Sequence, residues 1–293
     1  MSQTRASPGP RIGALLLALA CAACATPPAR HDWEPRLRGN AVVMLGEVHD
    51  NAAQHRLRLE ALRRAFAAGW RPAIAMEQFD RERQADIDRA RRERPGDALH
   101  LIALAAPASA RGGSGWNWDF YRPFVALALE YDVPLIAANL SSADTTRIVK
   151  GGDAAVFDAA SAARLGLDQP IAADWQAAHE REIDAGHCNA LPPSAWPRMA
   201  RAQLARDAAM AEALRQHAGE SGVVLLAGNG HVRRDIGVPR WLGAAWQGRV
   251  FTVAYLETDD DATPLTIFDA VVHTAPAPRP DPCAAFRPRS ARP

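Results

Sequence analysis

Five short apolar runs divide the chain, and none of them has the spacing of an amphipathic helix. They cover residues 41–45, 72–76, 133–138, 223–227 and 250–255. Runs of this length are typical of strands that are buried on both faces, and the segments between them have helical spacing of apolar residues. Buried strands that alternate with helices indicate a parallel sheet. We therefore predict one α/β domain with a mainly parallel central sheet flanked by helices.

Local signals refine this pattern at three places. Asp50 or Asn51 is suited to cap a helix after the first strand, and Pro123 is suited to the first turn of another helix. Residues 141–216 have mostly helical spacing, with segments expected at 172–185 and 196–216. Because no strand interrupts this region, it predicts a helical insertion or cap on the domain.

Composition places the chain among ordinary globular proteins. It has 293 residues, 48% of them hydrophobic, and a formal net charge of +1. The near-neutral charge gives no reason to expect a nucleic-acid partner. The domain is expected to span residues 40–274, followed by a proline-rich tail over residues 275–293.

The first residues have the proportions of an export signal. A basic start precedes a short apolar block over residues 12–23, which is too short to span a membrane. We predict a signal peptide over residues 1–24 and a linker over residues 25–39. Cys21 and Cys24 both lie in segments similar to a bacterial lipobox, and Cys24 is preferred because Ala22 and Ala23 precede it. The alternative is a cleaved secretory signal without a lipid.

Export changes the expectation for the other two cysteines. Cys188 and Cys283 form an even pair, and a disulfide is the usual outcome for such a pair in an oxidising compartment. The bond would hold the proline-rich tail on the body of the domain. A free thiol that binds a ligand is the alternative.

Polar residues follow four of the apolar runs. The residues at these ends are Glu47, His49, Glu77, Asn139, Asn229 and His231. The carboxyl ends of parallel strands lie along one edge of a sheet, where ligands bind in α/β proteins. The sequence therefore predicts that these side chains converge on one cleft.

The two glutamates and two histidines of this set support more than one chemistry. Glu47, His49, Glu77 and His231 could bind a hydrolytic divalent metal such as zinc, or carry out acid–base catalysis without a metal. They could also form only a polar network. His55, on the helix after the first strand, could face the same cleft or solvent.

Several motifs together resemble the ChaN-like haem-binding lipoproteins. The matching segments are residues 43–50, 76–79, 118–123, 137–140 and 228–239. Shorter matches lie between them, at residues 187–188, Met199, Gln203, residues 206–208 and residues 210–211, so the resemblance runs from about residue 41 to 257. It implies a lipid-anchored protein of iron and haem uptake. The alanine after either candidate cysteine is compatible with the outer membrane, so the protein is expected there, facing the periplasm. The resemblance also implies a homodimer that holds stacked haems.

The resemblance further implies that a tyrosine ligates the haem iron and that a histidine of the partner subunit holds the propionates. Tyr121 lies in a matching segment and is the first choice for the iron ligand, with Tyr255 second. His187 and Met199, in the helical region, are alternatives. The remaining residues expected around the haem are His49, His55, Asn229 and His231.

The same fold group also resembles erythromycin esterase-like and Tiki-type proteins. In these proteins related motifs serve hydrolysis, with a divalent metal in the Tiki type. Glu47, His49, Glu77 and His231 match that polar set. Haem binding is the leading interpretation and a hydrolase is the alternative, so the sequence leaves open whether the protein is an enzyme.

Overall fold

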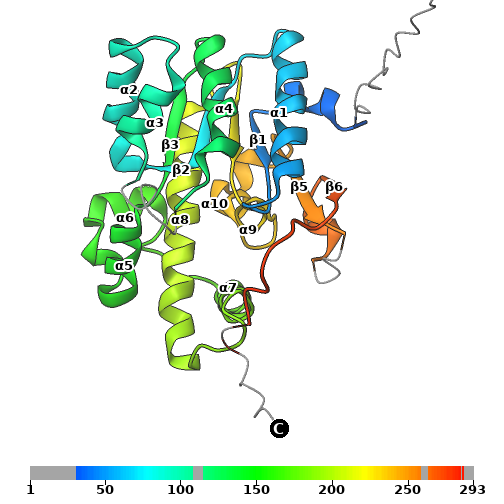
Figure 1. Ribbon diagram of the computed structural model, residues 1–293. Coiled ribbons are helices and arrows are strands. Elements are labelled where there is room, and N and C mark those ends of the chain that lie inside the picture. The colour runs from blue at the N-terminus through cyan, green and yellow to red at the C-terminus, as the bar shows by residue number, and fades with distance from the viewer. Residues whose placement is uncertain (1–30, 108–114, 259–262, 285, 287–293) are drawn as a thin grey trace, which may run out of the picture. The chain divides into compact units, whose positions relative to one another are not determined.

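The computed structural model describes residues 31–107, 115–258, 263–284 and 286 (Figure 1). The predicted signal peptide, Cys21 and Cys24 lie outside these residues. From Asp32 onward the chain forms one compact unit. None of the helices in the described ranges has the length and apolar character needed to cross a membrane.

A six-stranded sheet forms the centre of this unit, and all of its neighbouring strands are parallel (Figure 1). Its spatial order is β3-β2-β4-β1-β5-β6. The strands are β1 (Val42–Leu45), β2 (Ala73–Asp80), β3 (Leu135–Asn139), β4 (Val223–Leu226), β5 (Val250–Glu257) and β6 (Ala270–Thr274). The predicted fold class and all five predicted strands are confirmed. The sixth strand was not predicted, because it lies at an edge and is only partly buried.

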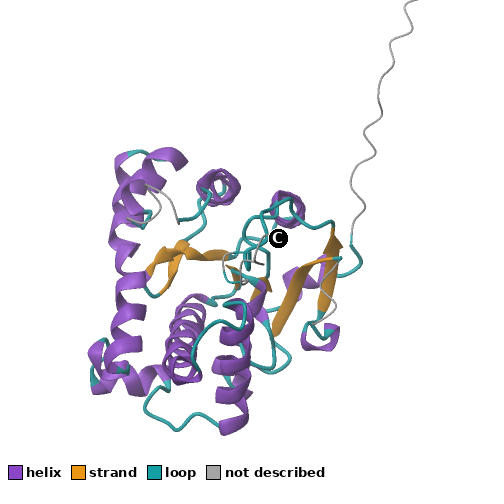
Figure 2. Cartoon of the chain, turned by 60° about the horizontal axis from the view of Figure 1, so that its bottom comes forward, coloured by secondary structure: helices purple, strands orange, loops and turns teal. Residues whose placement is uncertain are grey.

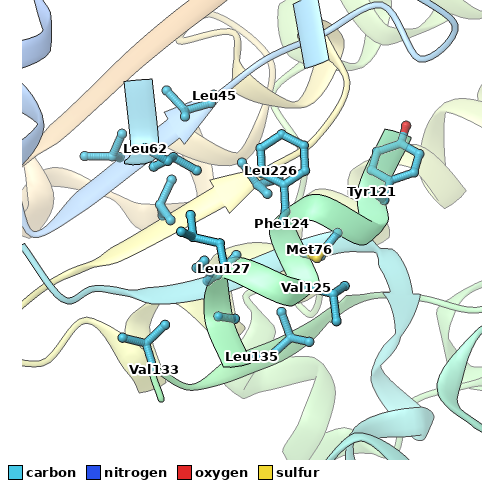
Figure 3. Packing of buried hydrophobic residues seen from close by; sticks show 14 of the residues in the cluster. Leu45, Leu62, Met76, Tyr121, Phe124, Val125, Leu127, Val133, Leu135 and Leu226 are labelled. Atoms are coloured by element: carbon cyan, nitrogen blue, oxygen red, sulfur yellow. The ribbon is translucent and has the colours of Figure 1, made fainter. Parts of the chain in front are cut away.

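Helices cover both faces of the sheet (Figure 2). Along β1, Val43 and Leu45 join the core cluster on one face, and Val42 and Met44 join the cluster on the other. The first face carries α1 (Ala52–Ala67), α2 (Gln84–Glu93), α3 (Ala98–Ala105) and α4 (Trp118–Glu130). Figure 3 shows part of the core on this face, where side chains of the helices pack against side chains of the strands. The second face carries α8 (Trp196–His217), α9 (Asn229–Val232) and α10 (Val238–Leu242).

The predicted helical insertion is present between β3 and β4. It consists of α5 (Ser142–Gly151), α6 (Ala159–Leu165), α7 (Ala173–Gly186) and α8. Met210 and Leu214 of α8 pack on the sheet, whereas Ala202 and Ala205 pack with α5 and α6. One helix therefore connects the sheet with the insertion beyond its carboxyl edge (Figure 1).

One helix boundary agrees with the sequence prediction, and two other boundaries differ from it. Asn51 is the residue that caps α1, with its side chain accepting hydrogen bonds from the backbone of Ala53 and Gln54. Pro123 lies inside α4, because Asn117 caps this helix and starts it at Trp118. The end of the predicted linker is folded, since a 3₁₀ helix, η1 (Glu34–Gly39), carries the fully buried Leu37.

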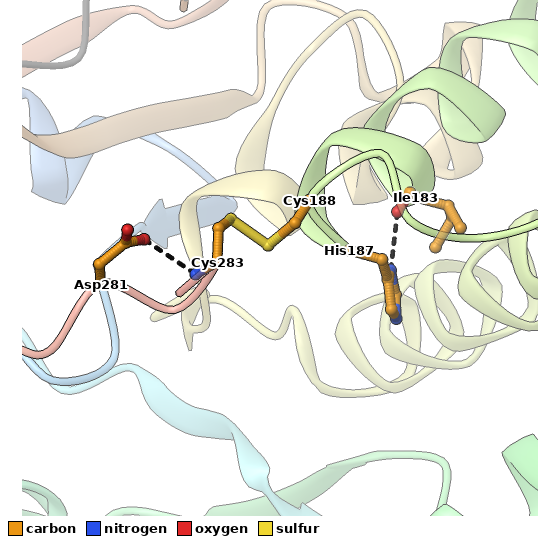
Figure 4. The surroundings of a disulfide bond; sticks show 5 residues. All are labelled: Ile183, His187, Cys188, Asp281 and Cys283. Carbon is orange, nitrogen blue, oxygen red and sulfur yellow. Dashed lines mark hydrogen bonds between the residues drawn. A yellow bond between two sulfur atoms is a disulfide. The ribbon is translucent and has the colours of Figure 1, made fainter. Parts of the chain in front are cut away.

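The described part of the tail is attached to the body at two places. A disulfide joins Cys188, after α7, to Cys283 (Figure 4), which confirms the predicted pair. Arg279 donates to both carboxylate oxygens of Glu257 at 2.8 and 2.6 Å and to Asp50 at 2.8 Å. These hydrogen bonds from Arg279 hold the pKa of Glu257 down at about 2. The tail thus runs from β6 past the loop after β1 to the helical insertion (Figure 1).

Candidate functional site

The first polar cluster surrounds the buried carboxylate of Glu47, directly after β1. The Tyr121 hydroxyl donates to its Oε1 at 2.7 Å, and Nδ1 of His49 lies 2.8 Å from the same oxygen. Its Oε2 contacts the Arg58 guanidinium and lies 3.1 Å from Nδ1 of His55. Helix α1 supplies Arg58 and His55, and α4 supplies Tyr121. Arg58, Tyr121 and His49 therefore stabilise a carboxylate whose burial alone would be costly, whereas Nδ1 of His55 makes no hydrogen bond to it.

Burial is the main influence on the pKa values in this cluster. It lowers the pKa of His55 to about 4, so this ring is neutral at pH 7. It lowers the pKa of Arg58 to about 10, which leaves the guanidinium charged. It raises the pKa of Tyr121, so the phenol keeps its proton. At neutral pH the cluster therefore pairs one cation with Glu47 and keeps the phenol as a donor.

A second polar cluster surrounds the buried carboxylate of Glu77 in β2. Arg206 of α8 donates to its Oε1 at 2.7 Å, and the backbone N–H of Gly228 donates to Oε2 at 2.8 Å. Nε2 of His231 lies 3.3 Å from Oε1. Nδ1 of His231 contacts the buried Asp207. His231 is thus placed between two carboxylates.

The charges in this second cluster support one another. Burial disfavours the imidazolium form of His231, but Glu77 and Asp207 outweigh it and raise its pKa to about 9. Burial likewise disfavours ionised Glu77, but His231 and Arg206 hold its pKa well below the usual range. His231 is consequently a cation at neutral pH.

The raised pKa of His231 predicts a pH dependence of stability. A group with a folded-state pKa of about 9 and a reference value of 6.5 stabilises fully below pH 6.5, and this stabilisation is lost as the pH rises through 9. Urea unfolding of the wild type should therefore show a decline from pH 6.5 to 9 that is reduced in His231→Gln. His217→Gln is the control, because the imidazole of His217 hydrogen-bonds the carbonyl of Ala213 in its own helix and has no carboxylate ion pair among the described residues. Equal slopes for wild type and His231→Gln would contradict the assignment.

A cavity of about 630 Å³ opens at the carboxyl edge of the sheet. This volume is within the range of about 300–1,000 Å³ found for ligand and cofactor sites. The cavity is lined by His49, Asp50, Asp80, Pro107, Gly115, Trp116, Asn117, Phe120, Asn139, Leu140, Ser142, Thr145, Thr146 and Arg206. Aromatic and aliphatic side chains thus share the lining with one imidazole, one guanidinium, the carboxylates of Asp50 and Asp80, and several amide and hydroxyl groups.

His49 connects this cavity with both polar clusters. Its side chain is 48% exposed and its ring packs edge-on against Trp116, with centroids 4.7 Å apart. A Cβ on Gly228 would lie 2.9 Å from Cε1 of His49 and 3.2 Å from Nε2. Glycine at 228 therefore lets the ring lie close to the backbone. Partial burial lowers the pKa of His49, so the ring is neutral at pH 7.

The six residues predicted at the strand ends do gather at one edge, but only His49 and Asn139 of this set line the cavity. Glu47, Glu77 and His231 are at most 5% exposed and are held by the partners described above. Asn229 is occupied with β5, because its side chain donates to the carbonyl of Tyr255 at 2.6 Å and accepts from the N–H of the same residue at 3.2 Å. The polar network therefore forms the base of the site.

The predicted iron ligands lie elsewhere than expected. Tyr121 is fully buried, its hydroxyl is bonded to Glu47, and it does not line the cavity. Tyr255 is also fully buried. Nδ1 of His187 donates to the carbonyl of Ile183 beside the disulfide (Figure 4), and neither His187 nor Met199 lines the cavity. The positions of these four residues do not support an iron-ligand role.

His55 faces the protein interior rather than the cavity. It is 4% exposed and stacks on Phe120, with ring centroids 4.7 Å apart. Nε2 of His55 lies 3.0 Å from the carbonyl oxygen of His49. His55 therefore supports the loop that carries His49.

Three functional neighbours were not assigned from the sequence. Arg58 lies on the buried face of α1, three residues after His55, and this polar spacing on an apolar helix face was the available signal. Asp207 is buried in the alanine-rich part of α8, and the family match at residues 206–208 was the available signal for it. Arg206, the preceding residue, donates hydrogen bonds from its guanidinium to Glu77 at 2.7 Å and to Asn139 at 3.0 Å.

In the residues that the structure describes, no three His, Cys, Asp or Glu side chains gather as metal ligands would. Each of the two buried carboxylates forms an ion pair with an arginine, Glu47 with Arg58 and Glu77 with Arg206. The arrangement instead offers one accessible imidazole beside an aromatic wall. Such a site suits a flat apolar ligand or a reaction that needs a neutral base.

The architecture and this cavity define an α/β protein with a ligand site at the carboxyl edge of its sheet. Residues 34–242 match the family described as haem-binding uptake, Tiki superfamily, ChaN. The match covers more than half of the chain, and the chain belongs to this family. No curated protein matches the chain by sequence.

Solved structures agree with this fold. ChaN of Campylobacter jejuni, whose structure is described as cofacial heme binding, is 20% identical with a TM-score of 0.61. The alignment covers 78% of this chain and 87% of that chain. An erythromycin esterase, EreC, in its open conformation is 13% identical with a TM-score of 0.45, covering 76% and 71%. At these identities the first likeness shows the fold alone, and the second carries no argument.

Proposed function

We propose that this protein binds haem in the cavity at the carboxyl edge of the sheet, as part of haem uptake. Membership of the haem-binding uptake family supports the ligand. The observation that carries the proposal is the cavity itself, in which Trp116 and Phe120 lie beside the half-exposed imidazole of His49. This combination supplies what a haem site requires.

The lining residues fit the chemistry of haem. The porphyrin needs an apolar slot, which Trp116, Phe120 and Leu140 supply, and its iron needs an axial ligand. The propionates need hydrogen-bond donors, and Arg206 is the cation that lines the cavity. When bound, haem supplies the iron that the uptake function carries. The protein's part is to enclose the ring and to anchor its ends.

A substitution that fills the cavity should remove haem binding. Thr145 lies on α5 and lines the cavity, so Thr145→Trp places an indole in the space that haem needs. We expect haemin affinity to fall at least about tenfold, equivalent to about 1.4 kcal/mol. Absorption titration of haemin with the purified protein measures this.

Lys150→Trp is the matched control for this substitution. Lys150 is exposed on the same helix and does not line the cavity. It should bind haemin like the wild type. A wild-type Soret shift in Thr145→Trp would place haem outside this cavity.

The proposal includes export and a lipid anchor on Cys24 or Cys21, with the protein on the outer membrane and facing the periplasm. The lipobox-like start of the chain supports this placement. The Cys188–Cys283 disulfide is consistent with an oxidising compartment. A second copy of the chain is the proposed partner, because the Campylobacter jejuni relative is described as binding heme cofacially.

A metal-free hydrolase is the second candidate function. The observation that favours it is the neutral imidazole of His49, which Glu47 orients and the cavity exposes. A neutral, oriented imidazole is suited to act as a general base. Screening the wild type and His49→Ala against ester substrates tests this candidate, and hydrolysis equal in both would exclude His49 as the base.

A further inference from the structure

We infer that Nε2 of His49 is the ligand that this chain gives to the haem iron, and that Glu47 is the residue that positions it. The inference rests on the proposed haem site. It replaces the expectation that a tyrosine ligates the iron.

The two nitrogens of His49 have different environments. Nδ1 lies 2.8 Å from the Glu47 carboxylate, so it carries the ring proton. Nε2 has no hydrogen-bond partner among the described residues, and the ring to which it belongs is 48% exposed in the cavity lining. Histidines that ligate metals commonly donate their other N–H to a carboxylate. His49 already has this arrangement.

No other described side chain of the lining offers a comparable donor atom. Haem iron is typically bound by histidine, cysteine, methionine or tyrosine side chains. Among the described lining residues, His49 is the one that belongs to this set. His231 lies nearby, but it is 5% exposed and its ring nitrogens face Glu77 and Asp207.

Glu47 is held firmly enough to act as a positioning residue. Its carboxylate is anchored by Arg58 and by the Tyr121 hydroxyl at 2.7 Å, and His55 supports the carbonyl of His49. The orientation of the His49 ring is therefore fixed from beneath the cavity. Tyr121 contributes to the haem site through Glu47 and not through the iron.

Haemin titrations of four samples test the ligand. The samples are the wild type, His49→Ala, His49→Ala with added imidazole, and Tyr121→Phe. We expect His49→Ala to lose the wild-type Soret position and at least about tenfold in affinity. Imidazole should restore the Soret position, because it replaces the deleted ring. Tyr121→Phe should keep the histidine-type spectrum.

The outcomes separate this inference from the proposed function. A wild type that binds no haemin overturns the proposed function and the inference with it. A wild type that binds, together with an unchanged spectrum in His49→Ala, overturns the inference alone. Circular dichroism checks that Tyr121→Phe is folded. If the folded variant loses the wild-type Soret band, Tyr121 and not His49 is the iron ligand.

A second pair of variants tests the position of the ring without removing it. A Cβ at 228 would come within 2.9 Å of the His49 ring, whereas a Cβ at 230 would meet nothing within 4 Å. We expect Gly228→Ala to shift the Soret band and weaken binding, and Gly230→Ala to behave like the wild type. Equal binding by both alanine variants would show that the ring position does not matter to haem.

The role of Glu47 has its own spectroscopic readout. A carboxylate partner raises the basicity of a ligating imidazole. Glu47→Gln should therefore lower the iron–histidine stretching frequency in resonance Raman spectra of the ferrous protein while haem remains bound. A frequency equal to that of the wild type would show that Glu47 does not act on the ligand.

Discussion

Arg58→Met is expected to lower the free energy of unfolding by about 3–5 kcal/mol, because it leaves a buried carboxylate without its cation. Arg58 is fully buried, contacts Glu47 and lies over the ring of Phe124. Methionine keeps the length of the apolar stem, so the loss reports the charge rather than a large cavity. Urea unfolding of both proteins measures the change.

Arg56→Met is the matched control for this prediction, since Arg56 is exposed on the same helix. It should change the free energy of unfolding by no more than about 0.5 kcal/mol. Adding Glu47→Gln to Arg58→Met should recover part of the loss, because the carboxylate charge is then removed as well. A loss below about 1 kcal/mol for Arg58→Met would show that Glu47 does not depend on this cation.

Removal of the Cys188–Cys283 disulfide is expected to cost about 4–5 kcal/mol in the chain-entropy model. The two cysteines are 95 residues apart, so the bond closes a long loop that includes β4, β5 and β6. Without it, the described part of the tail still has the hydrogen bonds from Arg279 to Glu257 and Asp50. The double variant Cys188→Ser and Cys283→Ser, compared with the wild type by urea unfolding, measures the loss.

A reducing agent provides the control for the disulfide prediction. Dithiothreitol should destabilise the wild type by about as much as the double substitution and should leave the double variant unchanged. Full stability of the reduced wild type would show that the bond does not constrain the unfolded chain.

The sheet was predictable from the sequence because its strands are buried on both faces. Such strands appear as continuous apolar runs, and β1 and β4 are fully buried along their whole length. Strand β6 escaped prediction because an edge strand with a part-exposed face has no such run. Order along the chain also located the carboxyl ends, which is why the polar residues toward the ends of β2 and β3 and after β1 and β4 were expected to gather.

The roles of the polar residues could not be predicted in the same way. Their position after the first apolar run placed Glu47 and His49 at the ligand-binding edge, but it could not show that Glu47 is buried and His49 half-exposed. That difference depends on Arg58, His55 and Tyr121, which reach Glu47 from α1 and α4. The family motif around Tyr121 predicted that its hydroxyl oxygen ligates the haem iron. Packing of α4 against the sheet instead directs this hydroxyl to the carboxylate.

The crystal structure of the protein soaked with haemin tests the central claim most directly. We predict haem in the cavity at the carboxyl edge, with its ring against Trp116 and Phe120 and its iron bonded to Nε2 of His49. Haem bound at another surface, with this cavity holding solvent alone, would contradict the claim.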